Sequence, residues 1–334
     1  MQAEEAARKI PSAFIHRRFH SFLGIWLVLF LIEHLLTNSE AALFFGADGE
    51  GFITMVNFIH SLPYLPVVEV ALLLIPFSLH IVWGIKYLFT MKQNAYGKDP
   101  SHPHLPENRR NHAYTWQRIT SWLLVIFVIL HVGQMRFLKY PETVRLGDED
   151  YFLVKVSEDA GLPTVAARLG IDTYTSPLIK AERRNFEMEK KARISTAEAR
   201  DAIVSLFTGQ ESLEKSSVIR QELEQKERFI EQLESFSLKH QEVVLMSKNI
   251  GTAFLMNVRD TFKSPLMLIL YSFFVLAAVF HASNGIWSFA VTWGLCLSVR
   301  GQRIVEKISF AFMALLAFLG LIAIWGTYLI NLKY

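Results

Sequence analysis

Cysteine is nearly absent from this chain, which has a single Cys among 334 residues. One cysteine excludes a disulfide framework, a cysteine-ligated zinc site and a self-contained four-cysteine iron–sulfur cluster. A strong charge of one sign is also missing, because 34 Lys and Arg stand against 31 Asp and Glu, which does not favour a nucleic-acid binder. The chain lacks a glycine-rich dinucleotide fingerprint as well, which excludes a nicotinamide or flavin site of that type.

Charged residues are concentrated in one block of the chain. Between Arg136 and Lys263 there are 20 basic and 21 acidic residues, whereas the other 206 residues carry only 14 and 10. Outside the block, apolar residues form five runs, each close to or above the roughly 20 residues that a membrane-spanning helix needs. The sequence therefore predicts an all-α integral membrane protein, with spans at about 19–38, 66–90, 119–138, 265–290 and 308–330.

The charged block is predicted to be a mostly helical insertion. We expect residues 1–139 to carry three spans, residues 140–260 to form the insertion, and residues 261–334 to carry two more spans. The stretches 185–207 and 211–246 are rich in residues that favour helix. A helical hairpin or a short coiled coil is one possible structure, because a heptad-like seam is present but is interrupted by two polar residues. The seam consists of Ile219, Leu223, Lys226, Ile230, Leu233 and Ser237. No catalytic constellation occurs in the insertion, which favours an accessory or partner-contacting role.

The basic residues outside the insertion predict the orientation in the membrane. The connection between the first two spans, 39–65, has no Lys or Arg. By the positive-inside rule the N-terminus is cytoplasmic, and the insertion and the C-terminus lie outside. The basic residues that support this are Arg8, Lys9, Arg17, Arg18, Lys92, Lys98, Arg109, Arg110, Arg118, Arg300, Arg303 and Lys307.

Four histidines lie inside apolar runs, one in each of the first four spans. At about 1.5 Å per residue, His34 and His131 are roughly 18–23 Å from the inner face. His80 and His281 lie on spans of the opposite direction, roughly 21–24 Å below the outer face. The sequence therefore predicts two levels on the order of 10–15 Å apart, with one histidine pair at each.

Paired histidines on facing helices suit the two axial positions of a haem iron. A single membrane histidine is as often a packing residue, but four on four spans favour a cofactor. Zinc is a weaker alternative, because two histidines leave its tetrahedral shell incomplete. We therefore expect two haems, bound without the Cys-x-x-Cys-His attachment motif.

Several segments of the chain carry a family resemblance. It resembles the five-helix di-haem cytochrome b subunit of bacterial succinate dehydrogenases and fumarate reductases, particularly the succinate:menaquinone type, over all five spans but not over the long insertion. The matching segments are Arg17-Arg18-Phe19-His20-Ser21, Leu31-Ile32-Glu33-His34-Leu35, Ser61-Leu62-Pro63, His80-x-x-x-Gly84, Gln117-Arg118-Ile119-Thr120, Ile129-Leu130-His131-Val132 and Phe280-His281-x-Ser283-Asn284-Gly285-x-Trp287-Ser288-Phe289-Ala290-Val291-Thr292-Trp293-Gly294.

The resemblance implies a membrane-anchor cytochrome b of the bacterial cytoplasmic membrane. A flavoprotein subunit with FAD and an iron–sulfur subunit would bind on the cytoplasmic side. Electrons would pass through two haems b to a membrane quinone, menaquinone in the matching type. His80 with His281 would ligate the cytoplasmic-side haem, and His34 with His131 the outer-side haem.

Further candidate residues concern the quinone site and the haem propionates. Glu69 lies near the outer end of the second span, where the family has a carboxylate implicated in quinone proton exchange, so the resemblance makes it a candidate for that role. Glu33, beside His34, is an alternative that would orient a ligand or line the same site. An interfacial Glu that only reaches the headgroups is the alternative. Candidate haem-propionate contacts at the inner face are Arg17, Arg18, His20, Ser21 and Arg118.

Three other functions remain open at this stage. The same subunit would serve a quinol:fumarate reductase, since sequence does not determine direction. A cytochrome b of a formate dehydrogenase or hydrogenase would pair with a molybdenum or nickel subunit instead. A haem-free anchor would only tether its partners, and haem content separates that case from the others.

Overall fold

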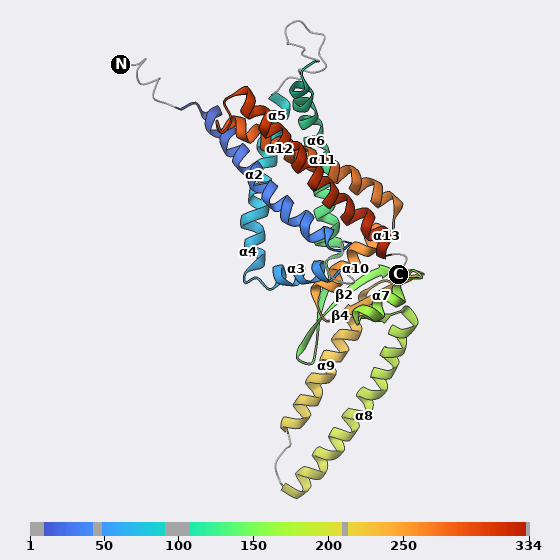
Figure 1. Cartoon of the computed structure of the whole chain (residues 1–334). Coiled ribbons are helices and arrows are strands. Elements are labelled where there is room, and N and C mark those ends of the chain that lie inside the picture. The colour runs from blue at the N-terminus through green and yellow to red at the C-terminus, as the bar shows by residue number, and fades with distance from the viewer. Residues whose placement is uncertain (1–9, 43–48, 91–106, 209–212, 332–334) are drawn as a thin grey trace, which may run out of the picture.

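The structure, a computed structural model, describes residues 10–42, 49–90, 107–208 and 213–331. This part of the chain is mostly helical and contains five spans that are long and apolar enough to cross a membrane (Figure 1). They are α2 (Ser12–Ser39), the run α4–η2–α5 (Leu65–Glu69, Val70–Leu74, Ile75–Thr90), α6 with η3 (Arg109–Val132, Gly133–Leu138), α11 (Pro265–Thr292) and α12–η4–α13 (Val299–Leu321, Ile322–Gly326, Thr327–Asn331).

Three of these helices begin seven to ten residues before their apolar runs. The helices α2, α6 and α12 start at Ser12, Arg109 and Val299. The turns before these apolar runs contain arginines, which favour helix about as well as leucine does, so the helix does not stop where the apolar residues do. They are Arg17 and Arg18 in α2, Arg109 and Arg110 in α6, and Arg300 and Arg303 in α12. Four of the basic residues used for orientation, together with the first two residues of the predicted 211–246 stretch, lie outside the described residues: Arg8, Lys9, Lys92, Lys98, Glu211 and Ser212.

The spans that carry histidine are grouped around α2 and α11. Helix α2 packs against α5, α11 and α12, and α11 also packs against α6. Helix α12, which has no histidine, lies against the outside of α2 and α11, with Leu35, Val279 and Leu316 buried between them. A side chain at Gly320 would collide with Val275 of α11, so this crossing needs a glycine.

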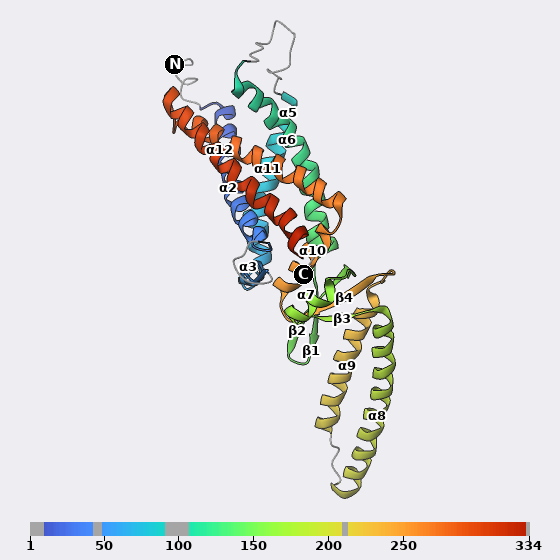
Figure 2. The same ribbon diagram turned by 45° about the vertical axis from the view of Figure 1, so that its right-hand side comes forward.

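A helical layer closes one end of the bundle. Helix α3 (Glu50–His60) lies across this end and packs on α10 (Ile250–Phe262), as Figures 1 and 2 show. Any side chain at Gly251 would collide with the carbonyl oxygen of Ile53, and the Gly251 N–H donates to Asn57 Oδ1 at 2.8 Å. Because α10 leads directly into α11, this layer connects the bundle to the charged segment.

The charged segment folds as an α/β unit, here called the module, from Glu142 to Phe262. Its sheet has the order β1-β2-β4-β3 with antiparallel neighbours throughout. Leu153 of β2 pairs with Met246 of β4, which sets the register of the two central strands. The strands are β1 (Glu142–Leu146), β2 (Glu149–Ser157), β3 (Asp172–Tyr174) and β4 (Glu242–Ser247), and the helices besides α10 are α7 (Leu162–Leu169), α8 (Ser176–Thr208) and α9 (Leu213–Ser235).

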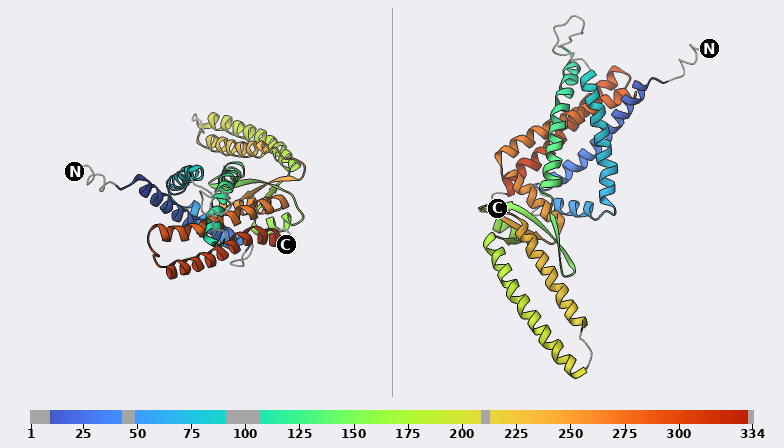
Figure 3. Two further views of the ribbon diagram at one scale, coloured as in Figure 1. Left: turned by 90° about the horizontal axis from the view of Figure 1, so that it is seen from above. Right: turned by 180° about the vertical axis from the view of Figure 1, so that it is seen from behind.

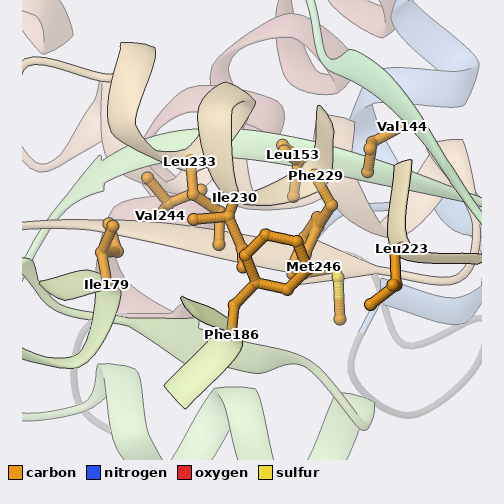
Figure 4. Close-up of a cluster of buried hydrophobic side chains, with 10 residues drawn as sticks. All are labelled: Val144, Leu153, Ile179, Phe186, Leu223, Phe229, Ile230, Leu233, Val244 and Met246. Carbon is orange, nitrogen blue, oxygen red and sulfur yellow. The ribbon is translucent and has the colours of Figure 1, made fainter. Parts of the chain in front are cut away.

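Apolar side chains cover both faces of the sheet. On one face, Phe186, Ile230 and Leu233 of the α8–α9 hairpin pack on the sheet (Figure 4). On the other face, α7 and α10 contribute a second core that includes Leu162 and Met256. The hairpin then projects away from the bundle, most plainly in the view from behind in Figure 3.

The expectation of an all-α chain is wrong in this segment. The run from Val243 to Met246 forms β4 and is buried on both faces, which explains why it is continuously apolar. It was assigned to a helix because the preceding residues favour helix so strongly. The hairpin itself is present: Leu223, Ile230 and Leu233 of the predicted seam are buried, and Ser237 lies beyond the end of α9.

Candidate functional site

The four membrane histidines meet as two pairs. The ring centroids of His34 and His131 are 5.8 Å apart, with planes at 81°. Those of His80 and His281 are 6.4 Å apart, with planes at 80°. Each pair joins two different helices, α2 with α6 and α5 with α11.

The two pairs lie at different levels along the bundle. On α11, Tyr271 contacts His131 of one pair, and His281 of the other pair follows ten residues later. On α6, Ser121 contacts His281, and His131 follows ten residues later. Ten helical residues span about 15 Å, so two helices give the same separation. The His34–His131 level is the one nearer the module, because α6 leads into β1 and α10 leads into α11.

The His34–His131 level contains a chain of side-chain hydrogen bonds. His131 Nδ1 is 3.1 Å from the Tyr271 hydroxyl, which donates to Gln134 Oε1 at 2.9 Å. Neither Tyr271 nor Gln134 was singled out from the sequence. Tyr271 is 140 residues away from His131 along the chain, so only the packing of α11 on α6 reveals the contact.

The other level has a third histidine. The ring of His20 stacks on that of His80, with centroids 4.1 Å apart and planes at 11°. His80 Nδ1 is 3.2 Å from the backbone carbonyl of His20. His281 Nδ1 faces the hydroxyl oxygens of Ser121 at 3.4 Å and Thr120 at 3.5 Å.

The donor set at each level fits a bis-histidine iron. Two imidazoles that bind one metal at about 2 Å each would have ring centroids roughly 6 Å apart, as both pairs do. Among the described residues no group of three or more His, Cys, Asp or Glu is placed to hold a metal, so neither level completes a zinc shell, and His20 stacks on His80 without adding a ligand. A Cβ at Gly285 or Gly133, next to the two levels, would meet nothing within 4 Å, which leaves room beside the rings.

The predicted propionate contacts are not gathered around one point. His20 packs on His80 and Tyr87, and its buried Nδ1 has no hydrogen-bond partner among the described residues. Arg18 lies over the ring of Phe14, with 3.5 Å from its guanidinium carbon to the centroid. Arg17 is exposed, whereas Ser21 and Arg118 are half-buried, the latter 6.0 Å from the ring of Tyr114.

A chain of hydrogen-bonded polar side chains, which the sequence did not predict, reaches the His80–His281 level from α12. Arg110 donates to Asn284 Oδ1 at 3.2 Å, lies 3.4 Å from Glu306 and has its guanidinium carbon 3.9 Å from the centroid of Trp287. Asn284 donates to Gln117 Oε1 at 3.0 Å, and Gln117 Nε2 donates to the backbone carbonyl of His281 at 3.1 Å. This chain ties α6, α11 and α12 together beside the His80–His281 pair.

Glu69 lies at the module end of the bundle and forms an ion pair. Its Oε2 is 3.0 Å from a guanidinium nitrogen of Arg136, whose guanidinium carbon is 4.4 Å from the ring centroid of Tyr140. The π-helical turn η2 starts directly after Glu69, and Arg136 lies inside η3. Such turns often occur at functional sites, because they redirect side chains at the helix surface. Glu33 is engaged elsewhere, accepting a hydrogen bond from Thr37 at 2.9 Å.

Helix α10 attaches the module next to this ion pair. Asp260 forms an ion pair with Lys139, with 2.8 Å between Oδ2 and Nζ, and its Oδ1 accepts a hydrogen bond from the Ser157 N–H at 2.8 Å. Asn257 donates a hydrogen bond to the backbone carbonyl of Lys139. Arg259, 3 % exposed, donates twice to Asp159, each time at 2.7 Å. Burial alone would raise the pKa of Asp159, but the hydrogen bonds from Arg259 and Lys263 outweigh it and hold that pKa far below its usual range.

The chain is similar to one curated protein over nearly its whole length. It is 25 % identical over 314 residues to the succinate dehydrogenase cytochrome b558 subunit of Bacillus subtilis (strain 168), covering 94 % of this chain and 96 % of that protein. No family model and no solved structure matches the chain significantly. The similarity, together with five apolar spans, supports a membrane protein related to succinate dehydrogenase cytochrome b subunits.

Proposed function

We propose that this chain is the membrane-anchor cytochrome b subunit of a succinate dehydrogenase. It would pass electrons from a flavoprotein and an iron–sulfur subunit through two haems b to a membrane quinone, menaquinone by resemblance. The single observation that carries the proposal is the meeting of four histidines from four spans as two pairs about 15 Å apart. The similarity to the Bacillus subtilis cytochrome b558 subunit supports the same conclusion.

Each pair would hold one haem through its ring nitrogens. A haem iron bound there supplies uptake and release of single electrons. For this, each histidine must be neutral, with one nitrogen unprotonated toward the iron and the other donating to the protein. The Nδ1 contacts of His80, His131 and His281 supply the second condition. His80 with His281 is assigned to the cytoplasmic-side haem and His34 with His131 to the outer-side haem.

The orientation follows from the two unlike ends of the bundle. The start of α2, the start of α6 and the connection from α11 to α12 lie together at the end opposite the module (Figure 1). This end carries Arg17, Arg109 and Arg300, so it is assigned to the cytoplasm and to contact with the iron–sulfur subunit. The module and the C-terminus are then outside the bacterial cytoplasmic membrane.

Glu69 is assigned to proton exchange with the quinone. Reduction of a quinone to a quinol takes up two protons with two electrons, so a carboxylate near the outer-side pair is chemically apt. Glu69 is 34 % exposed at the side chain and Arg136 43 %, so their ion pair is open to the surroundings. Arg136 would hold the Glu69 carboxylate in place through Oε2, and Oε1 would take up a proton from the surroundings and pass it to the quinone.

Purification through a tag on this chain, followed by enzyme assay, tests the assignment. We expect a flavoprotein and an iron–sulfur protein to co-purify, and the complex to reduce a menaquinone analogue with succinate. A molybdenum or nickel protein in their place, with formate or hydrogen as donor, would contradict the proposal. A Glu69→Gln variant should lose most quinone reduction while succinate oxidation by an artificial acceptor continues.

A matched variant controls for the position of the carboxylate. Glu33→Gln removes a carboxylate on α2 that hydrogen-bonds only within its own helix among the described contacts. We expect it to keep the quinone activity. If Glu33→Gln and Glu69→Gln lower that activity equally, the assignment of proton exchange to Glu69 is wrong.

A further inference from the structure

The hydroxyl of Tyr271 is held between His131 and Gln134. It lies 3.1 Å from His131 Nδ1 and 2.9 Å from Gln134 Oε1, both good hydrogen-bond distances. Phe262 and Phe274 pack on the Tyr271 ring, with centroids 5.2 and 6.1 Å away. The side chain is therefore fixed at both its ring and its hydroxyl group.

The direction of the two hydrogen bonds defines the state of His131. A phenol hydroxyl has one proton, and Tyr271 gives it to the amide oxygen of Gln134. Its oxygen is then an acceptor for His131, so Nδ1 carries the ring proton. In a neutral imidazole this leaves Nε2 unprotonated, with a lone pair free for a metal.

The contacts at the other level are of a different kind. His80 Nδ1 has a backbone carbonyl as partner, at 3.2 Å. His281 Nδ1 has two hydroxyl oxygens at 3.4 and 3.5 Å, near the limit of a hydrogen bond. Among the described contacts of these three rings, the one to Tyr271 is the shortest. It is also made by a side chain that a single substitution removes.

We propose that Tyr271, oriented by Gln134, is a positioning residue that sets the tautomer and the electron-donating strength of His131. A hydrogen bond from Nδ1–H makes the imidazole a more basic ligand, which favours the oxidised iron. Tyr271 therefore lowers the redox potential of the haem at the His34–His131 level and does not act on the other haem. This inference rests on the proposed function.

Potentiometric titration of both haems in the purified complex tests the inference. Tyr271→Phe keeps the ring and removes the hydroxyl, so we expect two haems per chain and a higher midpoint potential for one of them. At a fixed potential, its ratio of reduced to oxidised haem should rise about two- to tenfold, the range expected for one hydrogen bond. The low-spin electron paramagnetic resonance signal of the same haem should shift, which a loss of packing alone would not cause. Loss of that signal in His131→Ala identifies the haem.

Three further variants separate the relay from general effects. Tyr328→Phe removes a hydroxyl from the same apolar cluster without touching a histidine and should shift neither haem. Gln134→Leu should raise the same potential by less than Tyr271→Phe, and it keeps the test open if Tyr271→Phe does not assemble. The double variant should shift no further than Tyr271→Phe alone, because Gln134 acts only through Tyr271.

The outcomes distinguish this inference from the proposed function. Two haems with unchanged potentials in Tyr271→Phe, or equal shifts of both, overturn the inference and leave the function standing. An equal shift in Tyr328→Phe overturns it as well. A wild-type complex without haem overturns both.

Discussion

The bundle and the module use apolar residues in opposite ways. In α6 the buried residues are Asn111, Thr115 and Thr120, whereas Ile126 and Ile129 are exposed. In the module, Phe186 and Ile230 are completely buried and the helix surfaces are charged, as in soluble proteins. In α6 the polar side chains thus face the interior of the bundle and the apolar ones face outward, whereas the module buries apolar side chains and exposes charged ones. The exposed apolar surface of the bundle suits lipid, and α2, α11 and α12 in addition bury a small apolar cluster that includes Leu35, Val279 and Leu316.

Removing a histidine of the bundle should have the largest effect. We expect His80→Ala to eliminate the cytoplasmic-side haem, because one axial ligand is lost, and to reduce succinate:quinone activity by at least tenfold. Haem content and the reduced-minus-oxidised spectrum measure this. His240→Ala, at an exposed position of the module, is the control and should keep both haems. Retention of both haems in His80→Ala would show that the pairing is wrong.

The next largest effect should come from the junction between the two regions. Asp159→Asn leaves the guanidinium of Arg259 buried without its charged partner, and such losses cost about 3 kcal/mol. We expect thermal unfolding of the module at a lower temperature, with haem content unchanged. Lys248→Met breaks an exposed pair with Glu149 and should change little. Equal effects of the two variants would contradict a special role for the junction.

The junction should also make the module sensitive to acid. The folded-state pKa of Asp159 is depressed, so the stability it contributes is fully present above the unfolded pKa of about 4 and is lost as pH falls below it. We expect the unfolding temperature of the module to fall between about pH 4 and pH 2, and to fall less in Asp159→Asn. Parallel pH profiles of the unfolding temperature for the wild type and Asp159→Asn would contradict Asp159 as the source of the acid sensitivity.

Shortening the hairpin arm should have the smallest effect. Between Phe186 and Leu223 no described side chain is buried, and the ion pairs of Arg193 with Glu189 and Glu222 are partly exposed. Such pairs contribute about 1 kcal/mol or less each. Replacing residues 191–219 by a short glycine linker should therefore leave both haems and shift the unfolding temperature by only a few degrees. Loss of haem in this variant would show that the arm supports the bundle.

Sequence reasoning reached different depths in the two regions. The five spans follow from the length of the apolar runs. The pairing of His34 with His131 follows from the rise per residue of a helix, which is the same for any sequence. The strand β4 was missed, because Val243–Met246 is four residues long and continuously apolar, a pattern shared by strands and buried helices.

Side-chain partners from distant segments were also not predictable. The contact of Tyr271 with His131 and that of Arg136 with Glu69 depend on how each helix is rotated about its axis. The π-helical turn η3 begins two residues after His131 and changes that rotation for Gln134 and Arg136. No residue pattern in the sequence marks this turn. The ring of His20, a predicted propionate contact, stacks on that of His80, which the sequence does not reveal either.

Haem content per chain in the purified complex, with a difference spectrum using succinate as reductant, tests the central claim most directly. The two histidine pairs predict about two b-type haems per chain, at least one of them reduced by succinate. A complex that contains no haem would contradict the assignment of the four histidines and leave a membrane anchor alone.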